Sequence, residues 1–436
     1  MKRKYEGKKV LAAAMILALT VSMAGCGINA AAEENKGEMA LDNAGILTET
    51  ASGSAGGGST ADLSEYFTDR DLEQTADLSE AVVYELKDSE DITVTGEGVY
   101  VLRGRAADVT VTVEADKEAK VQLVLDGADV SNTDFPVIYV KSADKVFVTT
   151  TDSENTLSVT GTFTSDGDTN TDAVIFSKDD LVLNGKGTLT VNSSENGITG
   201  KDDLKITGGT LIVNSGADAI EANDGIYAAD GTVIINSGKD GLHAEKDDDP
   251  TAGRIYIASG SYTIQAEDDA IQGTTTVAIA GGTFSLTAGE AIEGTSVEIG
   301  GGSIEIDASD DGINASSKSS SVPTRIVIDG GTITIRMGSG DTDALDSNGD
   351  LYINGGSIDI TAQSAFDYDG QGQMSGGTVT VNGSQVTQLT NSMMGGGMKG
   401  GQDFRGQEGS FQGGQRPGRG GMRGKEQVDQ EQESWF

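Results

Sequence analysis

The sequence predicts an all-β protein, a right-handed parallel β-helix with three strands per coil. A Gly-Thr or Gly-Ser step recurs at intervals of 20 to 29 residues, and such a period is typical of a solenoid. The steps begin at Gly187, Gly209, Gly231, Gly260, Gly282, Gly302, Gly331, Gly356 and Gly377. Between them lie short segments of alternating apolar and polar residues, rich in β-branched side chains and without helical spacing. One coil cannot bury its own apolar side chains, so we expect the coils to stack around one core.

The clearest repeat lies within residues 204–225. Leu204 and Ile206 alternate with the polar Lys205, and after Gly-Gly we expect Leu211 and Val213 to point one way and Ile212 the other. A third short segment is centred on Ile220 and closes with Asn-Asp-Gly. Period-two alternation bounded by Gly, Asn and Asp predicts three strands separated by tight turns.

The charge of the chain limits its partners. The 436 residues carry a formal net charge of −39, which excludes nucleic acid and anionic lipid surfaces as binding partners. Such acidity serves solubility or the binding of divalent cations. A solenoid grows by adding coils, so this length requires no second folded domain, and we expect a monomer.

The N-terminus has the pattern of a secretory signal. Residues 1–25 contain a basic start and an apolar stretch, and Met23-Ala24-Gly25-Cys26 resembles a bacterial lipoprotein cleavage motif. We expect Cys26 to be lipidated, which places the protein on the extracellular face of the bacterial cell membrane. The alternative is a signal that is cleaved conventionally or not at all. Cys26 is the single cysteine, so disulfides are excluded within the chain.

Composition divides the remainder into four parts. Residues 26–60 are rich in Ala, Gly, Ser and Glu and predict a flexible tether. Residues 61–120 predict an N-terminal cap followed by irregular first coils, and residues 121–390 the regular β-helix. Residues 391–436, dominated by Gly, Gln, Met and Arg, predict a disordered tail.

Four ordered strings resemble a family of bacterial cell-surface carbohydrate-binding β-helices over residues 60–389. They are Val121-Gln122-Leu123-Val124-Leu125-Asp126-Gly127, Glu154-Asn155-Thr156-Leu157, Lys178-Asp179-Asp180-Leu181 with Gly185-Lys186-Gly187-Thr188-Leu189, and Lys201-Asp202-Asp203-Leu204. The resemblance implies a pectate-lyase-like fold, associated calcium, and binding of an acidic or neutral plant polysaccharide such as pectin or cellulose.

A column of acidic residues recurs before the third strand of successive repeats. Equivalent side chains in neighbouring coils lie about 4.8 Å apart, so stacked carboxylates repel unless a cation lies between them. Hard oxygen ligands favour Ca²⁺. We assign as metal ligands the column acids and the doubled acids of neighbouring turns: Asp179, Asp180, Asp202, Asp203, Asp218, Asp240, Asp269, Asp311 and Asp343. The alternative is that each Asp caps its own turn by accepting backbone hydrogen bonds.

Two outward columns are candidates for carbohydrate binding. The polar line on the third strand comprises Glu221, His243, Gln272, Glu293, Asn314, Asp346 and Asp367. Hydrogen-bonding groups at a regular pitch suit an extended glycan, although a solvated sheet would look the same.

On the first strand, Tyr227 and Tyr256 fall on adjacent coils and could stack on sugar rings. Alternatively, Tyr256 packs under the insertion at residues 247–253. The second-strand column around Ile234 reads as ordinary solvated sheet.

The sequence favours binding over catalysis. A lyase of the pectate type needs an Arg base beside its calcium site, and Arg336 is the one plausible candidate. Catalytic Ser or Cys motifs are missing from the body of the sequence, and we assign no catalytic residue. The alternatives are a calcium-dependent polysaccharide lyase and a structural surface stalk or adhesin.

Overall fold

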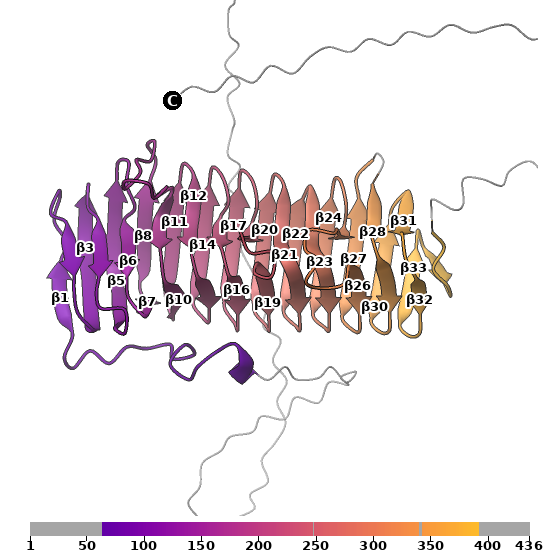
Figure 1. Cartoon of the computed structure of the whole chain (residues 1–436), viewed down its shortest axis with the longest axis horizontal. Coiled ribbons are helices and arrows are strands. Elements are labelled where there is room, and N and C mark those ends of the chain that lie inside the picture. The colour runs from indigo at the N-terminus through magenta and orange to yellow at the C-terminus, as the bar shows by residue number, and fades with distance from the viewer. Residues whose placement is uncertain (1–62, 247, 340–341, 392–436) are drawn as a thin grey trace, which may run out of the picture. The chain divides into compact units, whose positions relative to one another are not determined.

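The computed structural model describes residues 63–246, 248–339 and 342–391. These residues form a parallel β-helix in which strands three apart in the chain pair with one another (Figure 1). The predicted all-β class and three strands per coil are confirmed. The signal, Cys26, the tether and the tail from residue 392 lie outside the described residues. Within the described part of the chain, no helix has the length and apolar character needed to cross a membrane.

The coils have three faces, named by the order of strands in each coil. The first face contains β1 (Val82–Glu85), β3 (Gly98–Ala107), β5 (Lys120–Asn132), β7 (Lys145–Thr150), β10 (Asp180–Gly185), β13 (Asp203–Ile206), β16 (Gly225–Ala228), β19 (Arg254–Ile257), β21 (Asp269–Ile279), β23 (Glu290–Ile299), β26 (Arg325–Ile328), β29 (Asp350–Ile353) and β32 (Gly372–Met374).

The second and third faces complete each coil. The second contains β8 (Glu154–Val159), β11 (Thr188–Ser193), β14 (Thr210–Ser215), β17 (Thr232–Ser237), β20 (Ser261–Ala266), β22 (Thr283–Ala288), β24 (Ser303–Ala308), β27 (Thr332–Met337), β30 (Ser357–Thr361), β33 (Thr378–Val381) and β34 (Ser384–Val386). The third contains β2 (Ile92–Val94), β4 (Val111–Glu114), β6 (Ile138–Ser142), β9 (Ala173–Ser177), β12 (Asn196–Gly200), β15 (Ile220–Ala222), β18 (Leu242–Ala244), β25 (Ile313–Ala315), β28 (Asp343–Ser347) and β31 (Ser364–Tyr368). Four long strands turn a corner: β3 and β5 continue onto the second face, and β21 and β23 begin on the third.

The core is a stack of inward side chains from all three faces. On β22, Phe284, Leu286 and Ala288 are buried while the residues between them are exposed, as period-two alternation requires. The ring of Phe284 stacks on that of Tyr262 one coil away, with centroids 4.8 Å apart. Each coil therefore buries its apolar residues against its neighbours rather than against itself.

The recurrent glycine before the second strand is a backbone requirement. Gly377 has a φ of 76°, in the left-handed region that glycine tolerates. A Cβ added there would lie 2.5 Å from the carbonyl oxygen of Gly355 in the preceding coil. The glycine repeat in the sequence thus marks a turn that stacks closely on the turn of the preceding coil. Only glycine fits there without a steric clash.

An N-terminal strap, residues 63–74, precedes the first coil and begins with the 3-10 helix η1 (Leu63–Glu65). It runs along the first face across strands from β7 to β19 (Figure 1). The prediction that this region caps the end of the stack is wrong, since Val82 and Val83 of β1 remain 47% exposed. The strap has its own apolar and charged anchors on the first face, and these hold it along the side of the stack.

Candidate functional site

The polar line predicted on the third strands is a continuous ladder. Successive members lie opposite one another in strand register: Glu221–His243, His243–Gln272, Gln272–Glu293, Glu293–Asn314, Asn314–Asp346 and Asp346–Asp367. The close spacing of the coils lets neighbours interact directly, and the side-chain amide of Gln272 donates to Glu293 Oε2 at 2.8 Å. The repeat pattern therefore predicted the register of this line correctly.

The centre of this ladder is buried, which contradicts the expectation of an open row for a glycan. Three members expose less than a tenth of their surface, namely His243, Glu293 and Asn314. Insertions at residues 245–253 and 316–324 add contacts over it. Lys318 from the second insertion pairs with Glu293 at 2.7 Å, and Glu245 from the first lies 3.1 Å from His243 Nε2. These side chains face the insertions rather than solvent.

The acidic column forms a second ladder at the turn between the second and third strands. Asp218 Oδ1 accepts a hydrogen bond from the amide of Asp240 at 3.1 Å, and Asp240 Oδ1 accepts one from Asp269 at 3.0 Å. Further along, Asp311 Oδ1 accepts one from the amide of Asp343 at 2.9 Å. One oxygen of each accepting carboxylate therefore caps an amide of the next coil, not of its own turn as the alternative interpretation held, and its second oxygen is left for another partner.

At the N-terminal part of this column, the protein supplies the balancing cations itself. Lys239 Nζ lies 3.2 Å from both Asp218 and Asp240, and His243 Nδ1 lies 3.1 Å and 3.4 Å from the same two carboxylates. Burial acts to raise the pKa of Asp218, but the hydrogen bond and charge of His243 outweigh it and lower that pKa. Asp218, Asp240 and His243 have the spacing of a metal site. The positive charge of Lys239, however, already balances the two carboxylates.

One coil further, the carboxylates are less well compensated. Ligand atoms of Asp269, Glu290 and Glu293 lie within 4.8 Å of one another, and Asp269 also belongs to a group with Asp240 and Asp268. Burial and the neighbouring carboxylates raise the pKa of Asp269 to about 9. Burial likewise raises the pKa of Glu290 to about 7. We call Asp269, Glu290 and Glu293 the acidic triad; it could hold a metal ion.

A buried amide oxygen beside the acidic triad lacks a partner. Asn314 lies opposite Glu293 in the next coil, and its Nδ2 donates to Glu290 Oε2 at 2.9 Å. Among the described residues, Asn314 Oδ1 is one of few buried side-chain atoms without a hydrogen-bond partner. An orphaned buried acceptor costs about 1–3 kcal/mol. A cation at the acidic triad would remove that cost by taking this oxygen as a ligand.

The other predicted metal ligands do not join the triad. Asp179 and Asp180 lie at the turn between the third and first strands, where Asp180 is 3.5 Å from Lys145. Asp202 and Asp203 occupy the same edge one coil on, and burial followed by neighbouring acids raises the pKa of each to about 6. The nine predicted ligands are thus divided between two edges of the coil. Asp311 and Asp343 continue the capping ladder, whereas Asp268, Glu290 and Glu293 contribute to the metal-competent groups without having been predicted as ligands.

The tyrosines on the first face lie beneath the strap. Tyr227 and Tyr256 are in register on adjacent strands, as predicted. The ring of Tyr66 stacks on both, with centroid distances of 5.3 Å and 4.3 Å. The expectation of exposed rings is wrong for Tyr256, which is only 5% exposed. It is covered by the strap rather than by the insertion that the sequence suggested.

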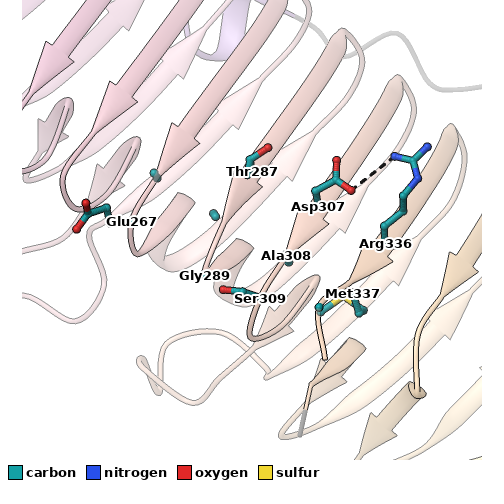
Figure 2. A pocket seen from close by; sticks show the side chains of 11 residues that line it. Glu267, Thr287, Gly289, Asp307, Ala308, Ser309, Arg336 and Met337 are labelled. Carbon is teal, nitrogen blue, oxygen red and sulfur yellow. Dashed lines mark ion pairs between the residues drawn. The ribbon is translucent and has the colours of Figure 1, made fainter. Parts of the chain in front are cut away.

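An open groove of about 420 Å³ crosses the second face. Its floor includes the buried Ala288 and Ala308 of neighbouring strands. Figure 2 shows Thr287, Asp307 and Arg336 projecting from successive strands above this floor. Sequence reasoning missed this groove because the second-face column that it considered, the one around Ile234, does not contain Thr287, Asp307 or Arg336. The sequence signal for the groove was a change of residue type along one column of the second face, from amide and hydroxyl residues to the pair Asp307 and Arg336.

The guanidinium of Arg336 is engaged by two carboxylates at the groove. Its Nη1 lies 2.5 Å from Glu305. The same atom lies 3.7 Å from Asp307, the pair that Figure 2 marks with a dashed line. The hydrogen bond from Arg336 to Glu305 and the charges of both acids raise the pKa of Arg336 further. This environment favours a fixed cation that can hydrogen-bond a ligand, and it opposes the deprotonation that a catalytic base requires.

The stacked coils, acidic edge and open groove define a parallel β-helix built to present polar groups at a regular pitch. The chain belongs to the family of carbohydrate-binding domain-containing proteins, which matches residues 88–344 and, again, residues 296–413.

Two individual proteins resemble parts of the chain. A carbohydrate-binding domain-containing protein of Acetivibrio thermocellus is 37% identical over 122 residues, covering 27% of this chain and 43% of that protein. The chain thus spans less than half the length of this curated relative. A solved structure, described as the polysaccharide lyase-like protein from C. thermocellum in a gadolinium derivative, is 29% identical with a TM-score of 0.44. That match covers 52% of this chain and 93% of the other.

Proposed function

We propose that this protein binds plant cell-wall polysaccharide, pectin or polygalacturonate or else cellulose, without cleaving it. The observation that carries the proposal is the groove on the second face, in a chain whose family binds carbohydrate. An apolar floor with a few polar groups at the rim is the usual composition of a small-ligand site. The C–H face of a sugar packs on Ala266 and Met337, the partly exposed apolar side chains of the groove, while its hydroxyls bond to Asp307 and Arg336.

The groove runs across the strands, which suits a polymer. It is lined from β20, β22, β24 and β27, four strands in successive register on the second face. Neighbouring strands are about 4.8 Å apart. A chain of repeating sugars laid across them meets a new set of side chains at each coil, and so accumulates many weak contacts.

We further propose that calcium occupies the acidic triad and stabilises one edge of this groove. The triad and Asn314 offer only oxygen ligands, which Ca²⁺ prefers, and lack the sulfur ligands typical of softer metals. The groove residues Glu267 and Gly289 are close neighbours in sequence of Asp269 and Glu290. An ion on the triad would therefore hold the two turns that form the end of the groove.

The protonated guanidinium of Arg336 favours binding of a polysaccharide over a lyase reaction. A lyase base must lose its proton, and Glu305 and Asp307 make that harder by raising the pKa of this guanidinium. A fixed, paired guanidinium instead offers donors of fixed geometry to sugar oxygens.

The proposal includes attachment to the outer face of the bacterial cell membrane through lipidated Cys26. The basic and apolar signal and the Met23-Ala24-Gly25-Cys26 motif support it. Metabolic labelling with palmitate tests it: label should enter the full-length protein and be lost in Cys26→Ala.

Retention on a panel of polysaccharides tests the function. Insoluble cellulose, immobilised polygalacturonate and starch are each incubated with the full chain in calcium and in EDTA. We expect retention on polygalacturonate or cellulose, little on starch, and weaker retention in EDTA. Release of unsaturated uronides would instead identify a lyase. Failure to bind any glycan, with the fold intact, would favour a structural stalk.

A further inference from the structure

The first face carries an unusual set of side chains where the strap covers it. Tyr227 and Tyr256 offer two aromatic faces in adjacent coils. Lys205 lies next to Tyr227 on the neighbouring strand, and Lys145 lies on the same side two strands further along; they are 8% and 9% exposed. Phe147, on the same face, lies under the guanidinium of Arg70 from the strap, 4.7 Å from its ring centroid. Together these residues make an aromatic platform with two buried cations at one end.

The strap places a planar ring on this platform. Tyr66 stacks on Tyr256 at 4.3 Å and on Tyr227 at 5.3 Å, with interplanar angles of 26° and 25°. Lys205 Nζ donates to the carbonyl of Tyr66 at 2.7 Å. Sugar rings pack their C–H faces on aromatic rings and their oxygens on neighbouring donors. Tyr66 thus combines ring stacking with a hydrogen bond from a neighbouring lysine, the same two kinds of contact that would hold a sugar ring.

The strap also places a carboxylate between the two lysines. Asp71 is fully buried and lies 3.2 Å from Lys145 Nζ and 3.4 Å from Lys205 Nζ. Burial acts to raise its pKa, but the Thr68 amide and both lysines outweigh burial and lower it. A buried carboxylate held by two cations is the arrangement that would receive the acid group of a uronate.

The strap leaves two polar atoms beneath it unsatisfied. Within the described residues, Tyr256 Oη and Arg254 Nε are buried without a hydrogen-bond partner. Tyr256 as a whole is 95% buried, and the Arg254 guanidinium lies 5.7 Å from the Tyr66 ring centroid. Each of these atoms disfavours the closed position of the strap, because a buried polar group without a partner has lost the hydrogen bonds that water would supply. The single hydroxyl of Tyr66 bonds neither of these atoms, whereas a sugar ring carries several hydroxyls.

We infer that the platform under the strap is a binding site for an anionic sugar, a uronate residue, and that the strap occupies it as a built-in competitor. Tyr66 takes the place of the sugar ring and Asp71 that of the carboxylate. This inference rests on the proposed function for its ligand class. It adds a second site, on a different face from the groove, whose ligand must displace residues 66–71. Gln74 remains as the hinge, since it bonds both Gly185 and Thr207 of the first face.

Strap-opening variants of the full chain test the inference with trigalacturonate as the probe and cellotriose as its neutral counterpart. The double variant Tyr66→Ser with Asp71→Asn removes the ring and the charge, and Asp69→Asn, on the exposed side of the strap, is the matched control. We expect trigalacturonate to bind the double variant at least about tenfold more tightly than wild type, because the ligand no longer pays to displace the strap. Adding Tyr256→Ala should abolish the gain, and cellotriose should show none.

Wild-type protein gives a second readout if the double variant fails to fold. Saturating trigalacturonate should speed hydrogen exchange at the amides of residues 66–72 while leaving those of β14 protected. Unchanged strap exchange, or a folded double variant that binds trigalacturonate no better than Asp69→Asn, overturns the inference. If that happens while wild type still binds polysaccharide through Arg336, only the strap site is lost. If no variant binds any polysaccharide, both this site and the proposed function fail.

Discussion

Asp240 Oδ1 accepts a hydrogen bond from the amide of Asp269, 3.0 Å away on the next coil. The other oxygen of Asp240 lies 3.2 Å from Lys239 and 3.4 Å from His243, whereas Asp269 lies among the other carboxylates of the acidic triad. Within one coil, the column changes from two acids paired with Lys239 and His243 to a cluster of three acids with one protein cation, Lys318, beside Glu293. This step explains why a uniform sequence pattern holds both capping residues and candidate metal ligands.

The first prediction concerns the charge of the triad. Asp269→Asn keeps a side-chain oxygen for the hydrogen bond from Gln272 but removes one negative charge, and cation affinity in oxygen sites depends on the number of charged ligands. We expect calcium affinity, measured by isothermal titration calorimetry, to fall at least about tenfold. Asp311→Asn, in the same column but outside the metal-competent groups, should bind calcium like wild type. Equal losses in both variants would show that the effect is general acidity rather than a site.

Calcium should stabilise the folded chain. A ligand that binds only the native state stabilises it by about 2.7 kcal/mol when present at one hundred times its Kd. Thermal unfolding followed by circular dichroism should therefore shift to lower temperature in EDTA and recover when calcium is restored. A melting curve indifferent to chelation would argue against an ion in the triad.

The pH dependence of stability should depend partly on Asp346. Burial, followed by the charges of Asp311, Asp367 and Asp343, raises the pKa of Asp346 from 3.8 to about 7. Between these values the folded state binds more protons than the unfolded state, so stability falls as pH rises through this window. Asp346→Asn should therefore gain on the order of 1 kcal/mol at about pH 8, after screening by solvent, and gain little near pH 4. Urea unfolding at both pH values checks this, with the exposed Asp359→Asn as the control.

The interior stack sets the cost of core truncation. Phe284 is 2% exposed and stacks on Tyr262, so Phe284→Ala should cost about 3–5 kcal/mol in the free energy of unfolding. The neighbouring outward Ser285→Ala should change it by less than about 0.5 kcal/mol. Similar costs for the two changes would contradict the assignment of inward and outward positions.

Register was predictable from the sequence because it is local. Once Gly377 and its equivalents set the turn, period-two alternation decides which side chain faces inward, and coil-to-coil pairs such as Glu221–His243 follow. The strand order, the core and the columns could all be obtained in this way without any long-range information.

Exposure was not predictable, because it depends on segments that lack the repeat. His243 is buried by residues that do not belong to the repeat, including Glu245 of an insertion. Tyr256 is covered by Tyr66, which is far away in the sequence and belongs to no coil. The distribution of cations was hidden for the same reason: Lys239 and Lys318 lie outside the motif, yet decide which acids are already balanced.

The most direct test of the central claim is the affinity of two arginine variants for polygalacturonate and cellulose. Arg336 lies at the groove on the second face, while Arg325 makes a similar ion pair with Glu298 on the first face. Isotherms on both polysaccharides should show Arg336→Ala weakened about tenfold and Arg325→Ala unchanged. If Arg336→Ala bound both polymers as wild type does, the groove would not be the site that holds the polysaccharide.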